Sequence, residues 1–353
     1  MRIKPYVMAC GVLLAATGCI KDLEPNIEAD ILDVSTDNEN VLNIVEHWGT
    51  IDVYGSPNLD PSDLTLSFTL SEGATITPDP ASVADYSSPR KFEVTSEDGE
   101  WVRQYIVAVT LNEIPTTFDF EHWMQPERMR YRMPYEQLGR EEGESDLYIW
   151  ASGNEAYNFL TNKHDNYTAF PTQPTEEAHS GNYAAKLLTR TTPELSKPIA
   201  SGSLYIGQFD ASKFEPREST QFGLPFRKKP LRLTGWCKYR SGGDKYMSGT
   251  PDEYRIRAVL YLTDSETKYL DGFTIKDSPN IVASAEMTGG DTPGEGYVKF
   301  DLPFEYKAQI DPVKLDEGAY NLAVMFSSSC DGDVYDGAPG STLLIDEVEI
   351  ICE

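Results

Sequence analysis

Apolar and polar side chains alternate over long segments of residues 113–353, and this period of two constrains the fold more than any other feature. Between Leu231 and Tyr239 every second residue is apolar or glycine, and polar residues plus one tryptophan fill the positions between them. The pattern recurs at 254–262, 298–302 and 320–326. Successive side chains of a strand point to opposite faces, so the alternation predicts half-buried strands. No segment shows a helical period of comparable strength, and we expect an all-β fold.

Residues 31–112 also consist of predicted strands and turns. Phe92–Thr95 and Tyr105–Val109 flank an Asp-Gly pair at 98–99, which is a strong hairpin signal. Five prolines between positions 57 and 89 argue against helices there. We therefore expect a small β-sandwich at 31–112. After a linker at 114–117, the rest of the region 113–353 is most economically a jelly-roll β-sandwich.

The first residues predict an export signal. A basic start is followed by the apolar run 6–16, which is too short to span a bilayer. Ala16-Thr17-Gly18 before Cys19 resembles the lipobox of bacterial lipoproteins, although that pattern usually has Leu where Ala16 stands. The resemblance implies a signal peptide at 1–18, an acyl anchor on Cys19 in the outer-membrane lipid, and a tether at 19–30. The alternative is an ordinary cleaved signal with an incidental cysteine.

Lys21 and the acids that follow it resemble the surface-export signal of Bacteroidetes lipoproteins, which implies a location facing the cell exterior. The net charge of the chain argues against two other classes of partner, nucleic acid and anionic lipid. Lys plus Arg number 30 and Asp plus Glu number 57, so the formal net charge is -27. A phosphate backbone needs clustered cations, which excludes nucleic acid. Anionic lipid would also be repelled, so any membrane attachment must be covalent or hydrophobic.

Three cysteines remain beyond Cys19, namely Cys237, Cys330 and Cys352. They allow at most one disulfide and therefore do not form a disulfide framework. Cys237 and Cys352 lie in alternating segments, where a cysteine behaves as a small core residue.

The chain resembles two kinds of Bacteroidetes surface domain. The segments 71–78 and 92–109 resemble the small immunoglobulin-like domains at the N-terminus of many surface lipoproteins, which act as spacers. The larger region resembles the putative carbohydrate metabolism domain (PCMD). Seven segments carry that resemblance, in order along the chain: Phe118–Trp123, Trp150–Asn154, His179–Leu187, Gly223–Phe226, Gly235–Tyr239, Phe326–Ser329 and Gly340–Ile350. It implies a jelly roll and a link to glycans, without an assigned activity.

A looser resemblance concerns the two ends of that domain. Jelly-roll carbohydrate-binding modules also begin with Phe-Glu and end with Ile-Asp-Glu-Val, and there the Glu and Asp ligate a structural calcium. The matching residues are Glu121 and Asp346. Asp346 shares its predicted strand face with Leu344, Val348 and Ile350, so we expect an inward carboxylate, which is costly without a partner. Oxygen ligands suit Ca²⁺. The alternative is a metal-free Asp that accepts backbone N–H groups or pairs with a base.

Sugars stack their apolar C–H faces on aromatic rings, and their hydroxyl groups form hydrogen bonds. Trp236 stands on the polar face of its predicted strand, where Arg232 and Lys238 could bind hydroxyls. The second candidates are Trp150 with Asn154, and Trp123. Each tryptophan has the alternative of packing under a loop or in the core.

Motifs for catalysis are absent from the sequence. There is no HExxH, CxxC pair, Walker loop or Gly-x-Ser-x-Gly, and we expect no organic cofactor. We therefore predict a lipid-anchored surface protein whose jelly roll binds a glycan or polysaccharide, alongside other glycan-uptake proteins of the cell surface. Catalysis stays open, with binding favoured. The alternatives are a glycoside hydrolase with a carboxylate pair, and a structural or adhesive protein without a small ligand.

Overall fold

The computed structural model describes residues 25–47, 49–111, 114–126, 129–137, 146–160, 166–192, 198–210, 213 and 215–353. The predicted signal peptide and Cys19 lie outside these residues. The described chain is all-β, with a small sandwich followed by a larger one, so the predicted fold class is confirmed. No helix among the described residues is both long enough and apolar enough to cross a bilayer.

The small sandwich packs a five-stranded sheet, in the order β2-β3-β7-β6-β5, against the pair β1-β4 around its own apolar core. Its elements are β1 (Ile31–Ser35), β2 (Val41–His47), β3 (Thr50–Gly55), β4 (Ser67–Leu70), β5 (Thr75–Thr77), η1 (Pro80–Ser82), β6 (Arg90–Thr95) and β7 (Val102–Thr110). The predicted hairpin at 98–99 joins β6 to β7 and is confirmed. Residues 25–30 also belong to this unit, because Ala29 lies in its core and Asn26 donates its backbone N–H to Glu97.

The larger sandwich packs two sheets around a second core. One sheet has the order β13-β18-β26-β22-β23-β25, with β19 and β20 beside it, and the other has the order β14-β15-β27-β21-β24, with β8 beside β27. The first sheet contains β13 (Trp150–Ala151), β18 (Ser203–Phe209), β19 (Thr220–Phe222), β20 (Leu224–Pro225), β22 (Tyr254–Leu262), β23 (Ile281–Gly289), β25 (Glu305–Tyr306) and β26 (Tyr320–Ser327). The second contains β8 (Thr117–Phe118), β14 (Thr172–Thr175), β15 (Ala184–Leu188), β21 (Pro230–Arg240), β24 (Val298–Pro303) and β27 (Thr342–Cys352).

Short elements fill the connections. They are the strand pairs β9 (Trp123–Met124) with β10 (Met133–Pro134), β11 (Glu136–Gln137) with β12 (Asp146–Leu147) and β16 (Arg190–Thr191) with β17 (Ile199–Ala200), the helices α1 (Asn154–Leu160), α2 (Pro216–Ser219) and α3 (Pro312–Asp316), and the turns η2 (Tyr167–Ala169) and η3 (Gly332–Val334). The predicted alternation is confirmed in β21, where Leu233, Cys237 and Tyr239 are in the core. Among the described residues, Cys237, Cys330 and Cys352 form no disulfide.

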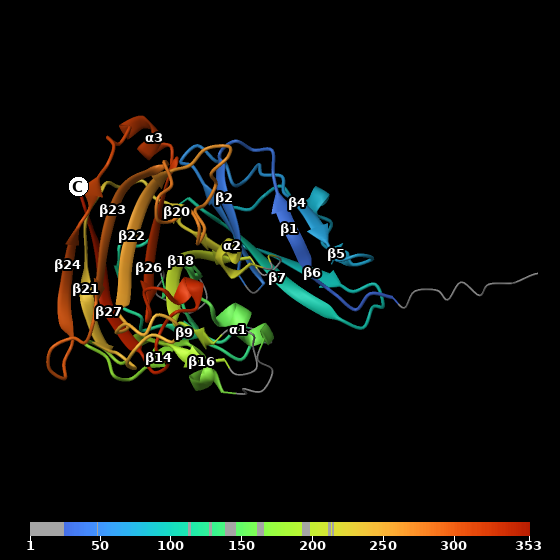
Figure 1. Ribbon diagram of the computed structural model, residues 1–353. Helices are drawn as coiled ribbons and strands as arrows, with labels where there is room; N and C mark the ends of the chain where they lie inside the picture. The colour runs from blue at the N-terminus through green and yellow to red at the C-terminus, as the bar shows by residue number, and fades with distance from the viewer. Residues whose placement is uncertain are drawn as a thin grey trace, which may run out of the picture.

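The two sandwiches share apolar packing. In Figure 1, β2 lies next to the larger unit, where it contacts β18 and β20. Val45 and Tyr54, from β2 and β3, belong to the core of the larger sandwich. Leu42 packs on Gly318, where an added Cβ would lie 2.4 Å from the leucine side chain. The small sandwich is therefore held against the larger one by buried side chains rather than by the linker alone.

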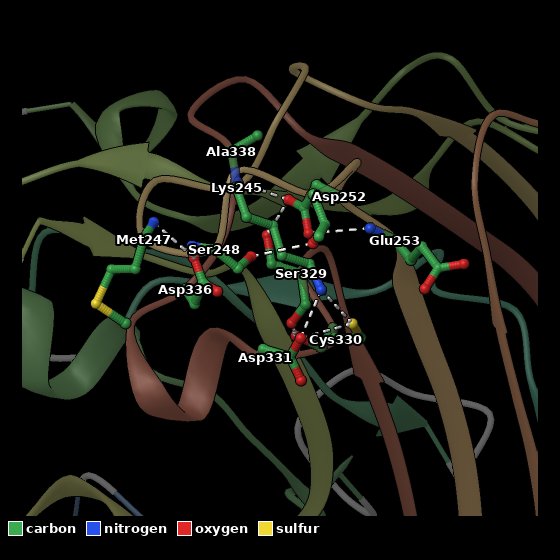
Figure 2. Close-up of polar contacts among 12 residues, drawn as sticks. Lys245, Met247, Ser248, Asp252, Glu253, Ser329, Cys330, Asp331, Asp336 and Ala338 are labelled. Carbon is green, nitrogen blue, oxygen red and sulfur yellow. Dashed lines mark hydrogen bonds and ion pairs between the residues drawn. The ribbon is translucent and has the colours of Figure 1, made fainter.

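Two loops, 241–253 between β21 and β22 and 328–341 between β26 and β27, close one end of the larger sandwich. The buried carboxylate of Asp252 joins them (Figure 2). Its Oδ2 accepts hydrogen bonds from Ser329 Oγ at 2.6 Å, Ser341 Oγ at 2.7 Å and the Ala338 N–H at 2.8 Å. Its Oδ1 accepts the N–H of Glu253 at 3.0 Å. Both oxygens of this buried charge are therefore satisfied by donors.

Two further contacts fix the same loops. The backbone N–H groups of Met247 and Ser248 donate to Asp336 Oδ1 at 2.9 and 3.3 Å. The ammonium of Lys245, whose residue is only 8% exposed, pairs with Asp331 beside Cys330. Figure 2 shows these groups meeting from both loops. The carboxylates of Asp252, Asp336 and Asp331 therefore have a structural role, since each of them already has its partners in the two loops.

We expect Asp252→Asn to lower the free energy of unfolding by roughly 2–3 kcal/mol. Both carboxylate oxygens now accept hydrogen bonds, and in the variant an amide NH₂ would replace one of them and face a hydrogen-bond donor. Urea denaturation followed by circular dichroism measures this. Asp301→Asn is the control, since Asp301 lies in an ion pair with Arg232 and its side chain is 46% exposed, where such pairs contribute little. Equal losses in the two variants would contradict the role of Asp252.

Candidate functional site

Trp236 lies on the face of β21 that points away from the core, as its alternation with Cys237 predicts. The imidazole of His179 stacks on the indole, with ring centroids 3.9 Å apart and the planes 18° from parallel. Tyr297 contacts the same imidazole at 5.7 Å in a tilted arrangement. His179 is exposed, while Trp236 and Tyr297 are half-buried. We call these three residues the aromatic platform.

Asp346 holds His179 in this position. Its Oδ2 accepts the backbone N–H groups of His179 at 2.7 Å and Ser180 at 3.0 Å, and its Oδ1 accepts the N–H of Glu347 at 2.9 Å. Burial raises the pKa of Asp346, while these N–H donors oppose the shift. The carboxylate thus fixes the backbone that carries the stacked ring.

Glu121 binds the next part of the same loop. It accepts the backbone N–H groups of Asn182 at 2.8 Å and Tyr183 at 3.0 Å, and the amide of the Asn182 side chain at 3.1 Å. Partial burial raises the pKa of Glu121, but the N–H donors outweigh it and the pKa is lowered. Gly181 has φ of +65°, and an added Cβ would lie 2.1 Å from Glu121 Oε1. Only glycine fits both the left-handed backbone and this close approach.

The expected orientation of Asp346 was wrong in one respect. A bulge in β27 places two residues of that strand, Glu347 and Val348, opposite one residue of β21, between the pairs Trp236–Asp346 and Thr234–Glu349. Glu347 has φ of +48° at this point. Val348 therefore faces the core, whereas Asp346 is on the outer face with Trp236. Asp346 is fully buried nonetheless, because the loop at 179–180 covers it.

The predicted calcium ion at Glu121 and Asp346 stays a prediction. The structure holds both carboxylates in the way that the metal-free alternative describes, with N–H groups as partners. An N–H group is not a ligand for Ca²⁺, which takes six to eight oxygens. Among the described residues, no group of three or more His, Cys, Asp or Glu has the spacing of a metal site. These residues alone therefore do not complete a calcium shell.

Lys238 and Arg232, the two residues predicted to bind sugar hydroxyls, lie at different distances from the platform. Lys238 pairs with Glu177 at 2.6 Å, and the Tyr297 hydroxyl donates to the Glu177 carbonyl at 2.6 Å. Arg232 is four residues from Trp236 along β21, about 13 Å away at the usual rise of a strand, and it pairs with Asp301. The structure thus brings Lys238 into the site and leaves Arg232 at its margin.

The second candidates belong to the interior. Trp150 is fully buried, and its N–H donates to Glu136 Oε1 at 2.7 Å. Asn154 is also fully buried and exchanges two hydrogen bonds with the backbone of Thr172. Residues without exposed surface do not stack on or bind a sugar. Trp150 and Asn154 therefore have the alternative role, which is packing in the core. Trp123 is half-buried against the core and donates to the Phe120 carbonyl at 2.7 Å.

The sequence reasoning missed three residues. His179 lies within a segment that carried the family resemblance, but nothing in its spacing indicated that it stacks on Trp236. Tyr297 lies between two strands, and its contact with His179 depends on the loop geometry. Glu136 was not distinguishable from the other acids. Burial raises its pKa to about 7, with the Trp150 N–H opposing this shift and the charge of Asp119 adding to it.

The family model of the "putative carbohydrate metabolism domain" (PCMD) matches residues 119–351, and this chain belongs to that family. A second model, "SGBP, N-terminal", matches residues 31–109. Both agree with the resemblances that the sequence carries.

Two crystal structures are similar to this chain, and both are described as those of a "putative glycoside hydrolase". The protein of Bacteroides thetaiotaomicron is 35% identical, with a TM-score of 0.84 over 94% of this chain and 99% of its own. The protein of Bacteroides vulgatus is 33% identical, with a TM-score of 0.60 over 68% of this chain and 98% of its own. No curated protein matches the chain.

From these contacts we expect Asp346→Ala to lower the melting temperature equally with and without a chelator, because the lost partners are backbone N–H groups. Thermal unfolding with EDTA and with added Ca²⁺ measures this for the wild type and the variant. A fall in melting temperature on chelation that the variant lacks would instead establish the calcium ion.

We expect the free energy of unfolding of Glu136→Gln, relative to that of the wild type, to be higher at pH 8 than at pH 5. The folded protein holds the Glu136 proton up to a pKa of about 7, against 4.5 for an ordinary glutamate. The wild type therefore loses stability as the pH rises from about 4.5 to about 7, by on the order of 3 kcal/mol at most. The variant lacks this slope. Parallel stability curves for the two proteins in chemical denaturation would contradict the assignment.

Proposed function

We propose that this protein is a lipid-anchored cell-surface protein that binds a glycan on the aromatic platform of its larger sandwich. The observation that carries the proposal is the stacked His179–Trp236 pair on an outer sheet face. Flat rings on that face offer an apolar surface to the C–H face of a sugar, and Lys238 and Glu177 beside them offer hydrogen bonds to hydroxyl groups.

The platform differs from the site that Trp236 alone would form. His179 covers one face of the indole, so the ring presented to solvent is the imidazole, with Trp236 as its support. Tyr183, four residues beyond His179 in the same loop, is 36% exposed, and its backbone is held by Glu121. Asp346 and Glu121 act here as positioning residues, because they hold the loop rather than contact the sugar.

Membership of the PCMD family supports a role with carbohydrate. The match to the SGBP N-terminal model, named after surface glycan-binding proteins, supports a location on the cell surface. Lipidation of Cys19, the outer-membrane location and cooperation with other glycan-uptake proteins rest on the sequence and belong to this proposal.

Glycoside hydrolysis is the alternative, and the description of the two Bacteroides relatives favours testing it. Hydrolysis needs two convergent carboxylates. Two acids beside the strands of the larger sandwich that could be considered for this role, Asp264 and Asp271, accept N–H groups within their own turns. A purely structural or adhesive role would leave the platform without a ligand.

A glycan array first identifies the glycan that the wild-type protein binds. We expect Trp236→Ala to weaken binding of that glycan by at least about five-fold, because the loss of one aromatic contact reduces the binding free energy by roughly 1 kcal/mol or more. Affinity electrophoresis and calorimetry with that glycan measure the effect. His179→Ala should also weaken binding, since it removes the ring presented to solvent.

The matched control is Trp101→Ala. Trp101 lies on the small sandwich and its residue is 50% exposed, so its loss should leave glycan affinity unchanged. Equal affinity of Trp236→Ala and the wild type would contradict the platform. Assaying the same glycans for new reducing ends separates binding from hydrolysis.

A further inference from the structure

The outer face of the first sheet carries a group of cations, on the opposite side of the larger sandwich from the aromatic platform. Arg255 and Arg257 lie two residues apart on β22, and their side chains are only 16% and 11% exposed. They point away from the core, because Ile256 between them belongs to it. Arg217 of α2 and Lys276, between β22 and β23, lie beside them. We call these four residues the cation cluster.

Two carboxylates serve the four cations. Glu286 of β23 lies opposite Arg257, accepts a hydrogen bond from it at 2.6 Å, and is 3.3 Å from the Nε atom of Arg255. Asp333 of η3 is 3.3 Å from a nitrogen of each of the other two cations. No other described acid, Glu253 included, forms an ion pair with the cation cluster. By its ion pairs, the cluster has two positive charges more than negative ones.

The segment before β23 joins the two halves of the cluster. The carbonyl of Ile275, which precedes Lys276, accepts a hydrogen bond from Arg257 at 3.4 Å. The carbonyl of Gly272, in the same segment, accepts one from Arg217 at 3.2 Å. The four side chains therefore surround one region of the surface rather than forming two unrelated ion pairs.

Arg255 has hydrogen-bonding capacity that the described chain does not use. A guanidinium group has five N–H donors, and none of those of Arg255 forms a hydrogen bond with a described residue. Its Nε atom is buried without an acceptor, as are those of Arg217 and Arg257, and the contact of Arg255 with Glu286 is an ion pair only. The accessible part of Arg255 is its two terminal nitrogens. Because largely buried polar groups normally have partners, these nitrogens are available to an external acceptor.

We propose that the cation cluster binds the acidic group of a polysaccharide, a carboxylate or a sulfate ester, whose oxygens accept the unused N–H groups of Arg255. The planar guanidinium group matches both kinds of oxyanion. Phe273 favours a sugar over a free inorganic ion. Its residue is 46% exposed and its ring lies against the guanidinium of Arg217, 4.2 Å from the centroid, so it offers an apolar surface to a sugar ring beside the charges.

The inference rests on the proposed function only in that the ligand is a glycan, and it does not use the platform. The net charge of -27 makes the test selective, because an acidic protein repels a polyanion. At physiological salt this repulsion is screened beyond about 8 Å, whereas ion pairs in direct contact persist. Binding of an acidic polysaccharide therefore requires a local cationic site.

Calorimetry with the wild-type protein at physiological salt tests the proposal. The probes are polygalacturonate, alginate, hyaluronan and κ-carrageenan, each beside its neutral counterpart, carboxyl-reduced for the first three and desulfated for the last. We expect at least one acidic polysaccharide to bind at least about ten-fold more tightly than its counterpart. Preference for a carboxylated probe assigns a uronic acid, and preference for κ-carrageenan assigns a sulfate ester.

Arg255→Gln should weaken that binding by at least about ten-fold. Lys276→Gln should weaken it as well, and because the Lys276 side chain is 40% exposed, this variant tests the site with little risk to folding. Two controls should keep wild-type affinity. Arg90→Gln removes an ion-paired arginine from the small sandwich, where its side chain is 39% exposed, and Trp236→Ala removes the platform. The melting temperature of each variant confirms folding.

Two results would overturn the proposal. One is the absence of binding by all four acidic polysaccharides up to about 10 mM sugar residues. The other is binding that neutralising the probe leaves unchanged, or that Arg255→Gln and Lys276→Gln both leave unchanged. A glycan whose binding is weakened by Trp236→Ala and by neither cluster variant would support the platform and contradict the cation cluster, so the two proposals fail separately.

Discussion

The buried carboxylate of Asp346 is the contact on which the candidate site depends. It lies on the last long strand and accepts two N–H groups from residues more than 160 positions earlier in the chain. Without those hydrogen bonds the loop would have no fixed height above β21, and His179 would have no fixed place on Trp236. Burial of an aspartate is costly unless its oxygens find donors. Here that cost is offset by bonds that also order a ring on the surface.

Asp252 and Glu136 show how differently this fold treats two buried carboxyl groups. Asp252 has donors at both oxygens, and all of them come from the loops that it joins. Glu136 accepts one hydrogen bond, from the Trp150 N–H, and lines a cavity together with three other acids, Asp119, Glu347 and Glu349. The first group stabilises the closed end of the sandwich. The second destabilises the protein when it ionises, because its pKa is raised by burial.

The strands of the larger sandwich could be predicted because alternation reports directly which side chains face a core. The same reasoning placed Trp236 correctly on the outer face of β21. It failed at Asp346, because one extra residue in a bulge inverts the faces of everything beyond it, and no signal in the sequence marks the bulge. It also failed for Trp150, since a tryptophan in a short strand has no alternation to show its face. His179 and Glu136 depend on contacts between distant segments, which local patterns do not contain.

The small sandwich is more than a loosely attached spacer. Val45 and Tyr54 take part in the core of the larger unit, so the orientation of the platform is fixed relative to the small sandwich. The residues before β1 are held as well, because Ala29 is buried and Asn26 is bonded to Glu97. If Cys19 carries the acyl anchor, only about six residues separate it from the packed chain, which limits the reach to roughly 20 Å even when fully extended. The position of the platform relative to the membrane would then depend on the small sandwich and on its packing against the larger one, with little contribution from the tether.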